Sequence, residues 1–268
     1  MIGVFDSGIG GLSVLAALRA ELPGERFIYV ADSGHAPYGE RDAVHVQSRA
    51  RALTTYLVNQ GIEALVVACN TATAAAIALL RAEHPDLPII GVEPAIKPAV
   101  ALSRSGRIGV MATRGTLGSD KFQQLLASLQ DQAHFVLQPC DGLALAIERS
   151  AEGTPESAAQ LAQVCQAHVQ ALDAPGQQLD TVVLGCTHYP LVRPLLEQLM
   201  EGVALVDTGK AVARQTRRRL EALGLRRPLP PGAPLVLRST GDSAALEHAA
   251  RRWISADAQV QSLKLPSA

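Results

Sequence analysis

The chain has 268 residues, of which 48% are hydrophobic and 18% are charged, and its formal net charge is −1. This length and composition are typical of a globular protein with one large or two ordinary domains. A nearly balanced charge gives no general attraction to nucleic acid or to an anionic membrane surface, so we expect neither as a partner.

The four cysteines, at positions 69, 140, 165 and 186, do not form a disulfide framework in a chain of this length. The longest uncharged apolar run, 64–80, is slightly short for a membrane-spanning helix and is interrupted by polar residues, so a buried strand followed by a helix is expected. Met1 leads directly into a strand-like segment with no basic region before it. We therefore expect no secretory signal and a cytoplasmic location.

Short apolar runs alternate with helical patterns along the whole chain. In chain order, strands are expected at 2–5, 27–31, 65–68, 89–92, 108–111, 134–137, 181–184, 204–206 and 235–238. Helices are expected at 12–21, 43–60, 73–83, 119–129, 157–172, 190–201, 210–223 and 243–253. This alternation predicts an α/β fold in which helices cross over between mainly parallel strands.

The two halves of the chain correspond to each other. Ile2-Gly3-Val4 recurs as Ile108-Gly109-Val110, and Cys69 and Cys186 each follow an apolar run at matching places in the same order. We therefore expect two pseudo-symmetric, Rossmann-like α/β domains. Ligands of open parallel sheets bind beyond the carboxyl ends of the strands, so the predicted active site is the cleft between the domains, with one cysteine on each wall.

A glycine-rich segment, Asp6-Ser7-Gly8-Ile9-Gly10-Gly11, joins the first strand to the first helix. It is not a dinucleotide fingerprint, because Ser13 stands where the third glycine would be, and no Gly-Lys-Ser/Thr follows for a phosphate loop. The glycines permit a tight turn and the close approach of a ligand. Asp6 either caps a plain turn or handles a proton beside Cys69, and we favour the second interpretation.

Each of the two matching cysteines is followed by polar residues that can begin a helix, in Cys69-Asn70-Thr71 and Cys186-Thr187-His188. A helix N-terminus favours thiolate, and it offers N–H and hydroxyl donors to a carboxylate. A single buried cysteine is usually only a small hydrophobe. Two in matching frames instead suggest a sulfur base on each side of a substrate, which is what inverting a carbon centre by proton transfer requires.

Other chemistries fit the sequence less well. There is no Cys-x-x-Cys pair, so we expect no zinc site or other metal, and none of the four lysines lies in a motif for pyridoxal phosphate. Cys140 and Cys165 are interpreted as structural. The arginines at 214 and 217–219 fall mostly on the outer face of a predicted helix, which is typical of a solvated surface.

Together these motifs resemble the glutamate racemase family of aspartate/glutamate racemases over essentially the whole chain. The residues that carry the resemblance are Asp6-Ser7-Gly8, Gly10-Gly11, Pro37-Tyr38-Gly39, Ala68-Cys69-Asn70-Thr71-Ala72, Gly185-Cys186-Thr187-His188-Tyr189-Pro190 and Val206-Asp207, with Thr240-Gly241-Asp242 near the end. The resemblance implies an isomerase that interconverts L-glutamate and D-glutamate without a cofactor and supplies D-glutamate for peptidoglycan synthesis. One departure is Phe122, where many relatives have tyrosine.

The resemblance also implies roles for particular residues. Cys69 and Cys186 would be the two bases, assisted by Asp6 and His188, with Glu148 as an auxiliary acidic residue. Substrate-binding positions would be Asp6, Ser7, Pro37, Tyr38, Gly39, Asn70, Thr71, Thr113, Thr116, Thr187 and His188.

The family fold implies that the first domain is split into 1–96 and 208–268, around a second domain at 97–207. We also expect a small-molecule substrate and a homodimer. Two alternatives remain open: a racemase of aspartate or another small acidic amino acid, and an amino-acid-binding protein without catalysis.

Overall fold

The computed structural model describes residues 1–268 except 173–177, 226–229, 231–233, 255–258 and 266–268. Its strands are β1 (Ile2–Asp6), β2 (Phe27–Ala31), β3 (Ala64–Val67), β4 (Ile89–Gly91), β5 (Arg107–Ala112), β6 (His134–Pro139), β7 (Thr181–Leu184), β8 (Ala204–Val206), β9 (Leu235–Ser239) and β10 (Val260–Ser262). None of the helices in these described ranges is long and apolar enough to cross a membrane.

The helices lie between the strands in chain order. They are α1 (Leu12–Glu21), α2 (Ala43–Asn59), α3 (Asn70–Glu83), α4 (Ile96–Leu102), α5 (Arg114–Leu117), α6 (Asp120–Ala127), α7 (Leu143–Ser150), α8 (Pro155–Leu172), α9 (Arg193–Leu199), α10 (Gly209–Ala222) and α11 (Ser243–Ile254), with short 3-10 turns at Ser33–His35, Tyr38–Glu40 and Tyr189–Val192.

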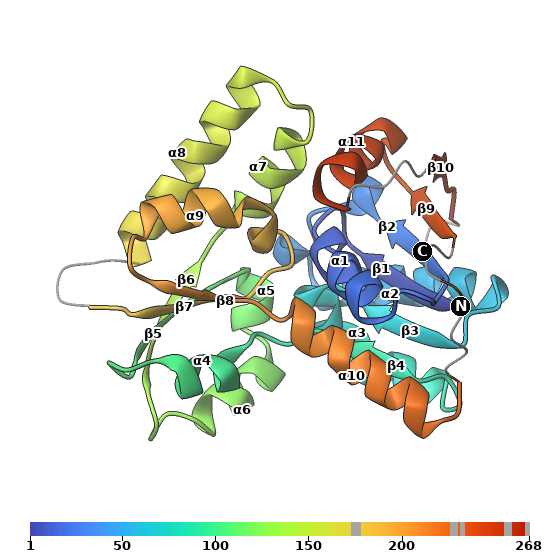
Figure 1. The fold of residues 1–268 in the computed structure, drawn as a ribbon, viewed down its shortest axis with the longest axis horizontal. Helices are drawn as coiled ribbons and strands as arrows, with labels where there is room; N and C mark the ends of the chain where they lie inside the picture. The colour runs from blue at the N-terminus through green and yellow to red at the C-terminus, as the bar shows by residue number, and fades with distance from the viewer. Residues whose placement is uncertain (173–177, 226–229, 231–233, 255–258, 266–268) are drawn as a thin grey trace.

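The strands form two sheets, and every strand pairing is parallel (Figure 1). The first sheet has the order β10-β9-β2-β1-β3-β4, and the second has the order β6-β5-β7-β8. The second order repeats the β2-β1-β3-β4 part of the first. The predicted fold class is therefore confirmed: two α/β units share one topology, and β3 and β7, which precede the two matching cysteines, occupy equivalent places.

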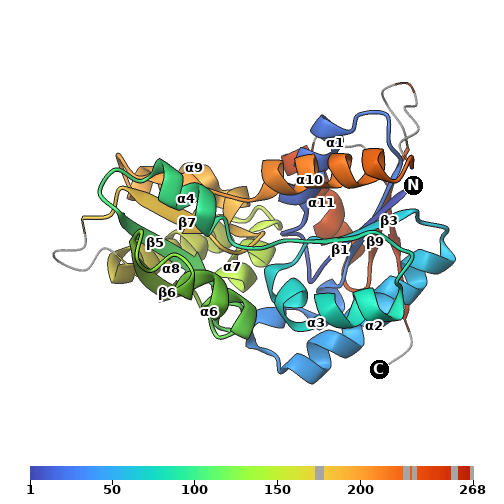
Figure 2. The same ribbon diagram turned by 90° about the horizontal axis from the view of Figure 1, so that it is seen from below.

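Side chains alternate between the faces of each strand and so bury both faces. Figure 2 shows α1 and α10 on one side of the first sheet and α2 and α3 on the other. Ile2 and Val4 of β1 pack in the cluster that includes α1, α10 and α11, whereas Phe5 packs in the cluster of α2 and α3. In β7, Val182 and Leu184 face the cluster that includes α7–α9, and Val183 faces α4 and α6. A strand covered by helices on both faces reads as a continuous apolar run, which is why the strand predictions succeeded.

The boundaries differ from the expected ones in a few places. α3 begins at Asn70 and not at residue 73, because the Cys69 side chain caps it. The expected helix at 190–201 is a 3-10 turn followed by α9. Four short elements were not expected. They are the helices α4, α5 and α7, none of which is longer than eight residues, and the three-residue strand β10.

The division of the chain into 1–96 plus 208–268 and 97–207 stays a proposal. It is supported by sheet membership, since β1–β4, β9 and β10 form one sheet and β5–β8 form the other. After β8 the chain returns from the second sheet to the first. Asp207 anchors this return, since it pairs with Arg193 and accepts a hydrogen bond from the backbone N–H of Gly209 at 3.0 Å.

Asp180 fixes the start of β7 against the turn before β5. Its carboxylate accepts hydrogen bonds from the Ser103 hydroxyl at 2.6 Å and from the backbone N–H groups of Arg104 and Ser105, both at 2.7 Å. Desolvation is the largest single effect and raises the pKa of Asp180, but the hydrogen bonds together outweigh it and lower the pKa well below its usual value.

We therefore predict that Asp180→Asn lowers the free energy of unfolding at pH 7 by about 1 kcal/mol, because the charge-assisted hydrogen bonds are partly exposed to solvent. The folded-state pKa lies below the unfolded value of about 3.9, so this contribution is fully present above that pH and is lost as pH falls through the folded-state pKa. Urea unfolding at several pH values measures it. A difference between the two proteins that grows below pH 4 would contradict the assignment.

Candidate active site

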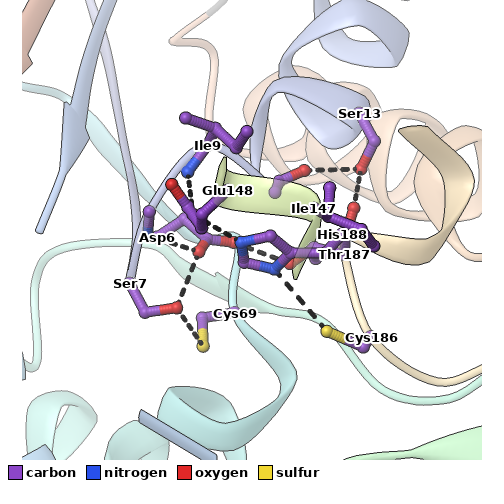
Figure 3. Close-up of polar contacts among 12 residues, drawn as sticks. Asp6, Ser7, Ile9, Ser13, Cys69, Ile147, Glu148, Cys186, Thr187 and His188 are labelled. Carbon is purple, nitrogen blue, oxygen red and sulfur yellow. Dashed lines mark hydrogen bonds and ion pairs between the residues drawn. The ribbon is translucent and has the colours of Figure 1, made fainter. Parts of the chain in front are cut away.

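A pocket that opens to solvent lies at the carboxyl ends of the strands of both sheets. It is lined by Ser7, Pro37, Tyr38, Gly39, Glu40, Cys69, Asn70, Thr71, Thr113, Cys140, Asp141, Gly142, Ala144, Cys186, Thr187 and His188. Both sulfurs of the matching cysteines therefore face one space, and they enter it from different elements (Figure 3).

Cys69 follows β3 and is the N-cap of α3. Its sulfur accepts a hydrogen bond from the backbone N–H of Ala72 at 3.4 Å and lies 3.9 Å from the Ser7 hydroxyl. Burial raises the pKa of the Cys69 thiol strongly, the negative charge of Asp6 adds to the effect, and the N–H of Ala72 opposes it. In this structure Cys69 is therefore a protonated thiol at neutral pH, held at a helix start that can later stabilise its thiolate.

Cys186 follows β7 and lies beside a histidine. The sulfur of Cys186 is 3.6 Å from Nδ1 of His188, and Nε2 of the same ring is 2.6 Å from Oε1 of Glu148. Burial alone would lower the pKa of His188, but its hydrogen bonds to Cys186 and Glu148 raise it well above the usual value. The raised pKa favours the imidazolium form of His188.

The loop after β1 is hydrogen-bonded to the loop after β7. Oδ2 of Asp6 accepts from the Thr187 hydroxyl at 2.7 Å, and Oδ1 accepts from the Ser7 hydroxyl at 3.0 Å and the N–H of Gly8 at 2.9 Å (Figure 3). The Ser13 hydroxyl donates to the carbonyl of Thr187 at 2.8 Å. Burial raises the pKa of Asp6, while His188 and these donors lower it in part.

The glycines of this loop leave space for side chains of the other unit. A Cβ at Gly8 would lie 1.8 Å from Oε1 of Glu148, and a Cβ at Gly10 would lie 2.3 Å from Nδ1 of His188. The missing side chains therefore make room for two residues of the other unit, and the close approach of a ligand stays a prediction.

Three threonines join the starts of α3 and α5 at the other side of the pocket. Oγ1 of Thr71 is 3.0 Å from Oγ1 of Thr113, which is also 3.0 Å from Oγ1 of Thr116. Thr113 caps α5 through the N–H of Thr116 at 3.2 Å. Hydroxyl groups at two helix starts can together bind an anionic group such as a carboxylate.

Most of the predicted site residues meet at this pocket, and three do not line it. Asp6 and Glu148 lie behind the wall, where they contact Thr187 and His188, and Thr116 lies behind Thr113 and lines a neighbouring cavity. The roles assigned to the predicted residues remain proposals.

Other functional candidates were missed. Cys140, interpreted as structural, lines the pocket together with Asp141, Gly142, Ala144 and Glu40. Cys140 directly follows β6, so the same position at the carboxyl end of a parallel strand would have indicated it. Asp32, which follows β2, contacts the pocket residue Tyr38 and could have been found in the same way.

The residues that the structure describes contain no group of three or more histidine, cysteine, aspartate or glutamate side chains able to hold a metal ion. The four cysteines are all buried and free.

The Asp/Glu/Hydantoin racemase family model matches residues 8–216. Curated relatives named glutamate racemase include one from Ectopseudomonas mendocina, 52% identical over 220 residues (82% of this chain and 81% of the relative), and one from Pseudomonas putida, 46% identical over 266 residues (99% and 92%). The chain belongs to the Asp/Glu/Hydantoin racemase family.

Solved structures of the same fold are also glutamate racemases. An isoform from Bacillus anthracis is 32% identical with a TM-score of 0.85, over 99% of this chain and 98% of that chain. The Escherichia coli protein, crystallised with L-glutamate and the activator UDP-MurNAc-ala, is 32% identical with a TM-score of 0.84, over 99% and 98%.

We predict that Glu148→Gln lowers the pKa of His188, because the variant loses the negative partner of the buried ring. Nuclear magnetic resonance titration of labelled histidines measures it, with the exposed His134 as the internal control. Because the pKa of His188 is raised in the folded state, its pairing with Glu148 contributes fully to stability below the usual histidine pKa. This contribution is lost as pH rises through the raised folded-state pKa. An unchanged His188 titration would contradict the pairing.

Proposed function

We propose that the protein interconverts L-glutamate and D-glutamate by a two-base mechanism in which Cys69 and Cys186 exchange protons with the α-carbon. The observation that carries this proposal is the pair of buried thiols, which enter one pocket from equivalent strands of the two sheets. The relatives named glutamate racemase and the Escherichia coli structure with L-glutamate support glutamate as the substrate.

In the L-to-D direction, the Cys186 thiolate removes the α-proton of L-glutamate, and the electron pair stays on the α-carbon. The thiol of Cys69 then gives its proton to the opposite face and becomes a thiolate. The D-to-L direction reverses both steps. The states of the side chains suit the first direction, because His188 is positively charged beside Cys186 and burial keeps Cys69 protonated.

The thiolate alone cannot complete the reaction, because an amino-acid α-proton is a very weak acid. A free thiol is only roughly 3% ionised at pH 7, and the carbanion must be stabilised by donors in a site that excludes water. Asn70 and Thr71 at the start of α3, with Thr113 and Thr187, are positioned to bind the two carboxylates of the substrate. Asp6 and Glu148 act indirectly, by holding Thr187 and His188.

We also propose that the reaction needs neither metal nor cofactor, that the product D-glutamate serves peptidoglycan synthesis, and that the protein acts in the cytoplasm as a homodimer. These proposals follow from the resemblance to glutamate racemases.

The substrate and the cofactor requirement are tested together. We expect that purified protein treated with a chelator converts either enantiomer of glutamate to the same mixture, as followed by circular dichroism, and that it converts aspartate at least tenfold more slowly. Glutamate that binds without turnover would indicate a binding protein, and faster aspartate turnover would indicate the other racemase. Activity restored only by added metal, or a pyridoxal absorption band that tracks activity, would exclude the cofactor-free reaction.

The division of labour between the thiols is tested with Cys69→Ser and Cys186→Ser. Each variant should lose racemisation by about a thousandfold or more, because a serine hydroxyl is too weak an acid to supply the base. A glutamate analogue with chloride on the β-carbon isolates one half-reaction: a base removes the α-proton, chloride leaves with its electron pair, and the enamine hydrolyses to an oxo acid and ammonia.

We expect Cys69→Ser to eliminate chloride from the L-analogue and Cys186→Ser from the D-analogue. Cys165→Ser is the matched control, since that buried thiol does not line the pocket and should leave both reactions intact. Near-normal racemisation in either active-site variant, or loss of the same enantiomer's elimination in both, would contradict the assignment.

A further inference from the structure

The Thr240-Gly241-Asp242 turn has no place in the proposed mechanism, although it is one of the segments that resemble the family. It follows β9 and does not line the pocket. Its position in the fold nevertheless connects it to the pocket wall.

The turn packs directly on the segment that follows β2. The Thr240 hydroxyl donates to Oδ1 of Asp32 at 2.7 Å and accepts from the N–H of Gly34 at 3.2 Å, while the backbone N–H of Thr240 donates to the carbonyl of Ala31 at 3.0 Å. A Cβ at Gly241 would lie 2.8 Å from the nitrogen of Gly34, so this contact requires glycine.

Asp32 carries the contact inward to the pocket. Its carboxylate is fully buried, and Oδ2 accepts from the Tyr38 hydroxyl at 2.5 Å. Arg49 donates from Nε to Oδ2 at 3.0 Å and from Nη2 to Oδ1 at 2.8 Å. Tyr38 and the adjoining Gly39 line the pocket, so the chain of contacts runs from Thr240 through Asp32 to the substrate wall.

We propose that Thr240 is a positioning residue for substrate binding: its hydroxyl orients the Asp32 carboxylate, which holds Tyr38 and Gly39 in the pocket. This inference rests on the proposed function. It assigns the C-terminal part of the chain a task in the active site, since β9 brings the turn to the carboxyl end of the neighbouring strand β2.

The expected kinetic effect is on KM more than on kcat. Neither Thr240 nor Asp32 hydrogen-bonds to the sulfur of Cys69 or Cys186. A misplaced Tyr38 therefore weakens the binding of the substrate and of the transition state alike, which raises KM and leaves kcat nearly unchanged.

The test compares variants that differ by one buried hydroxyl. We expect Thr240→Val to raise KM for glutamate about tenfold, with kcat within about twofold, because one hydrogen bond to a charged group is lost. Thr240→Ser keeps the hydroxyl and should restore KM. Thr216→Val is the control, because the buried Thr216 hydroxyl donates to the carbonyl of Val212 in its own helix, at 2.9 Å, and does not line the pocket, so its loss should leave KM unchanged.

A double-mutant cycle tests the path through Tyr38. In a Tyr38→Phe background, where the phenolic hydroxyl is already absent, Thr240→Val should add little further change in KM. An equal effect of Thr240→Val in both backgrounds would overturn the proposal. An unchanged KM in Thr240→Val, or an equal rise of KM in the Thr216→Val control, would also overturn the proposal. A wild-type protein that does not racemise glutamate would instead overturn the proposed function, so the two failures are distinguishable.

Discussion

The active site depends on one carboxylate oxygen that both halves of the molecule share. Oε1 of Glu148, on α7, accepts from the backbone N–H of Ile9 at 2.7 Å and from Nε2 of His188 at 2.6 Å. A buried charge must be paired and hydrogen-bonded, because otherwise its desolvation costs several kcal/mol. The loop after β1 and the loop after β7 must therefore stay close together, and this brings Cys69 and Cys186 to the same pocket.

The same constraint explains the glycine-rich loop and the charge state of the histidine. Gly8 and Gly10 have no side chains that would collide with Glu148 and His188. The Glu148 carboxylate of one unit can therefore reach the backbone N–H of Ile9 in the other. The hydrogen bonds of Cys186 and of this carboxylate together raise the pKa of His188 against the effect of burial. Glu148 thus influences both the backbone of the loop after β1 and the pKa of His188.

Under the proposed function the pocket binds a dicarboxylate, although no lysine or arginine is among the described residues that line it. Glu40 and Asp141 lie in its wall, and Arg114 pairs with Asp141 at 2.6 Å and so offsets one of these charges. Under the proposed function, the carboxylates of the substrate are bound by hydroxyl groups and by the N–H groups at the starts of α3 and α5. Neutral donors of this kind bind a carboxylate without a strong ion pair. They therefore do not hold the neighbouring α-carbon in the position that suits one enantiomer alone.

The sequence was sufficient to predict the two units, the parallel strands and the two cysteine loops, because each depends on local pattern: buried strands are continuous apolar runs, and helix starts carry capping residues. It was insufficient for Asp32 and Cys140, whose importance comes from what folds against them. Asp32 becomes significant only when Tyr38, Arg49 and Thr240 converge on it from three parts of the chain. The reason for Gly8 was equally hidden, since Glu148 is far away in the sequence.

The repeated topology shows how a symmetric fold carries an asymmetric site. β3 and β7 place a cysteine at equivalent strand ends, which suits a reaction that must act on both faces of one carbon. The other equivalent ends differ: β1 is followed by Ser7 and β5 by Thr113, while β2 is followed by Asp32 and β6 by Cys140. Cys186 consequently has an imidazolium neighbour, whereas Cys69 has a hydroxyl and a helix start. Under the proposed mechanism, the two directions of the reaction therefore begin from different proton arrangements, and substrate binding must redistribute the protons before D-glutamate can react.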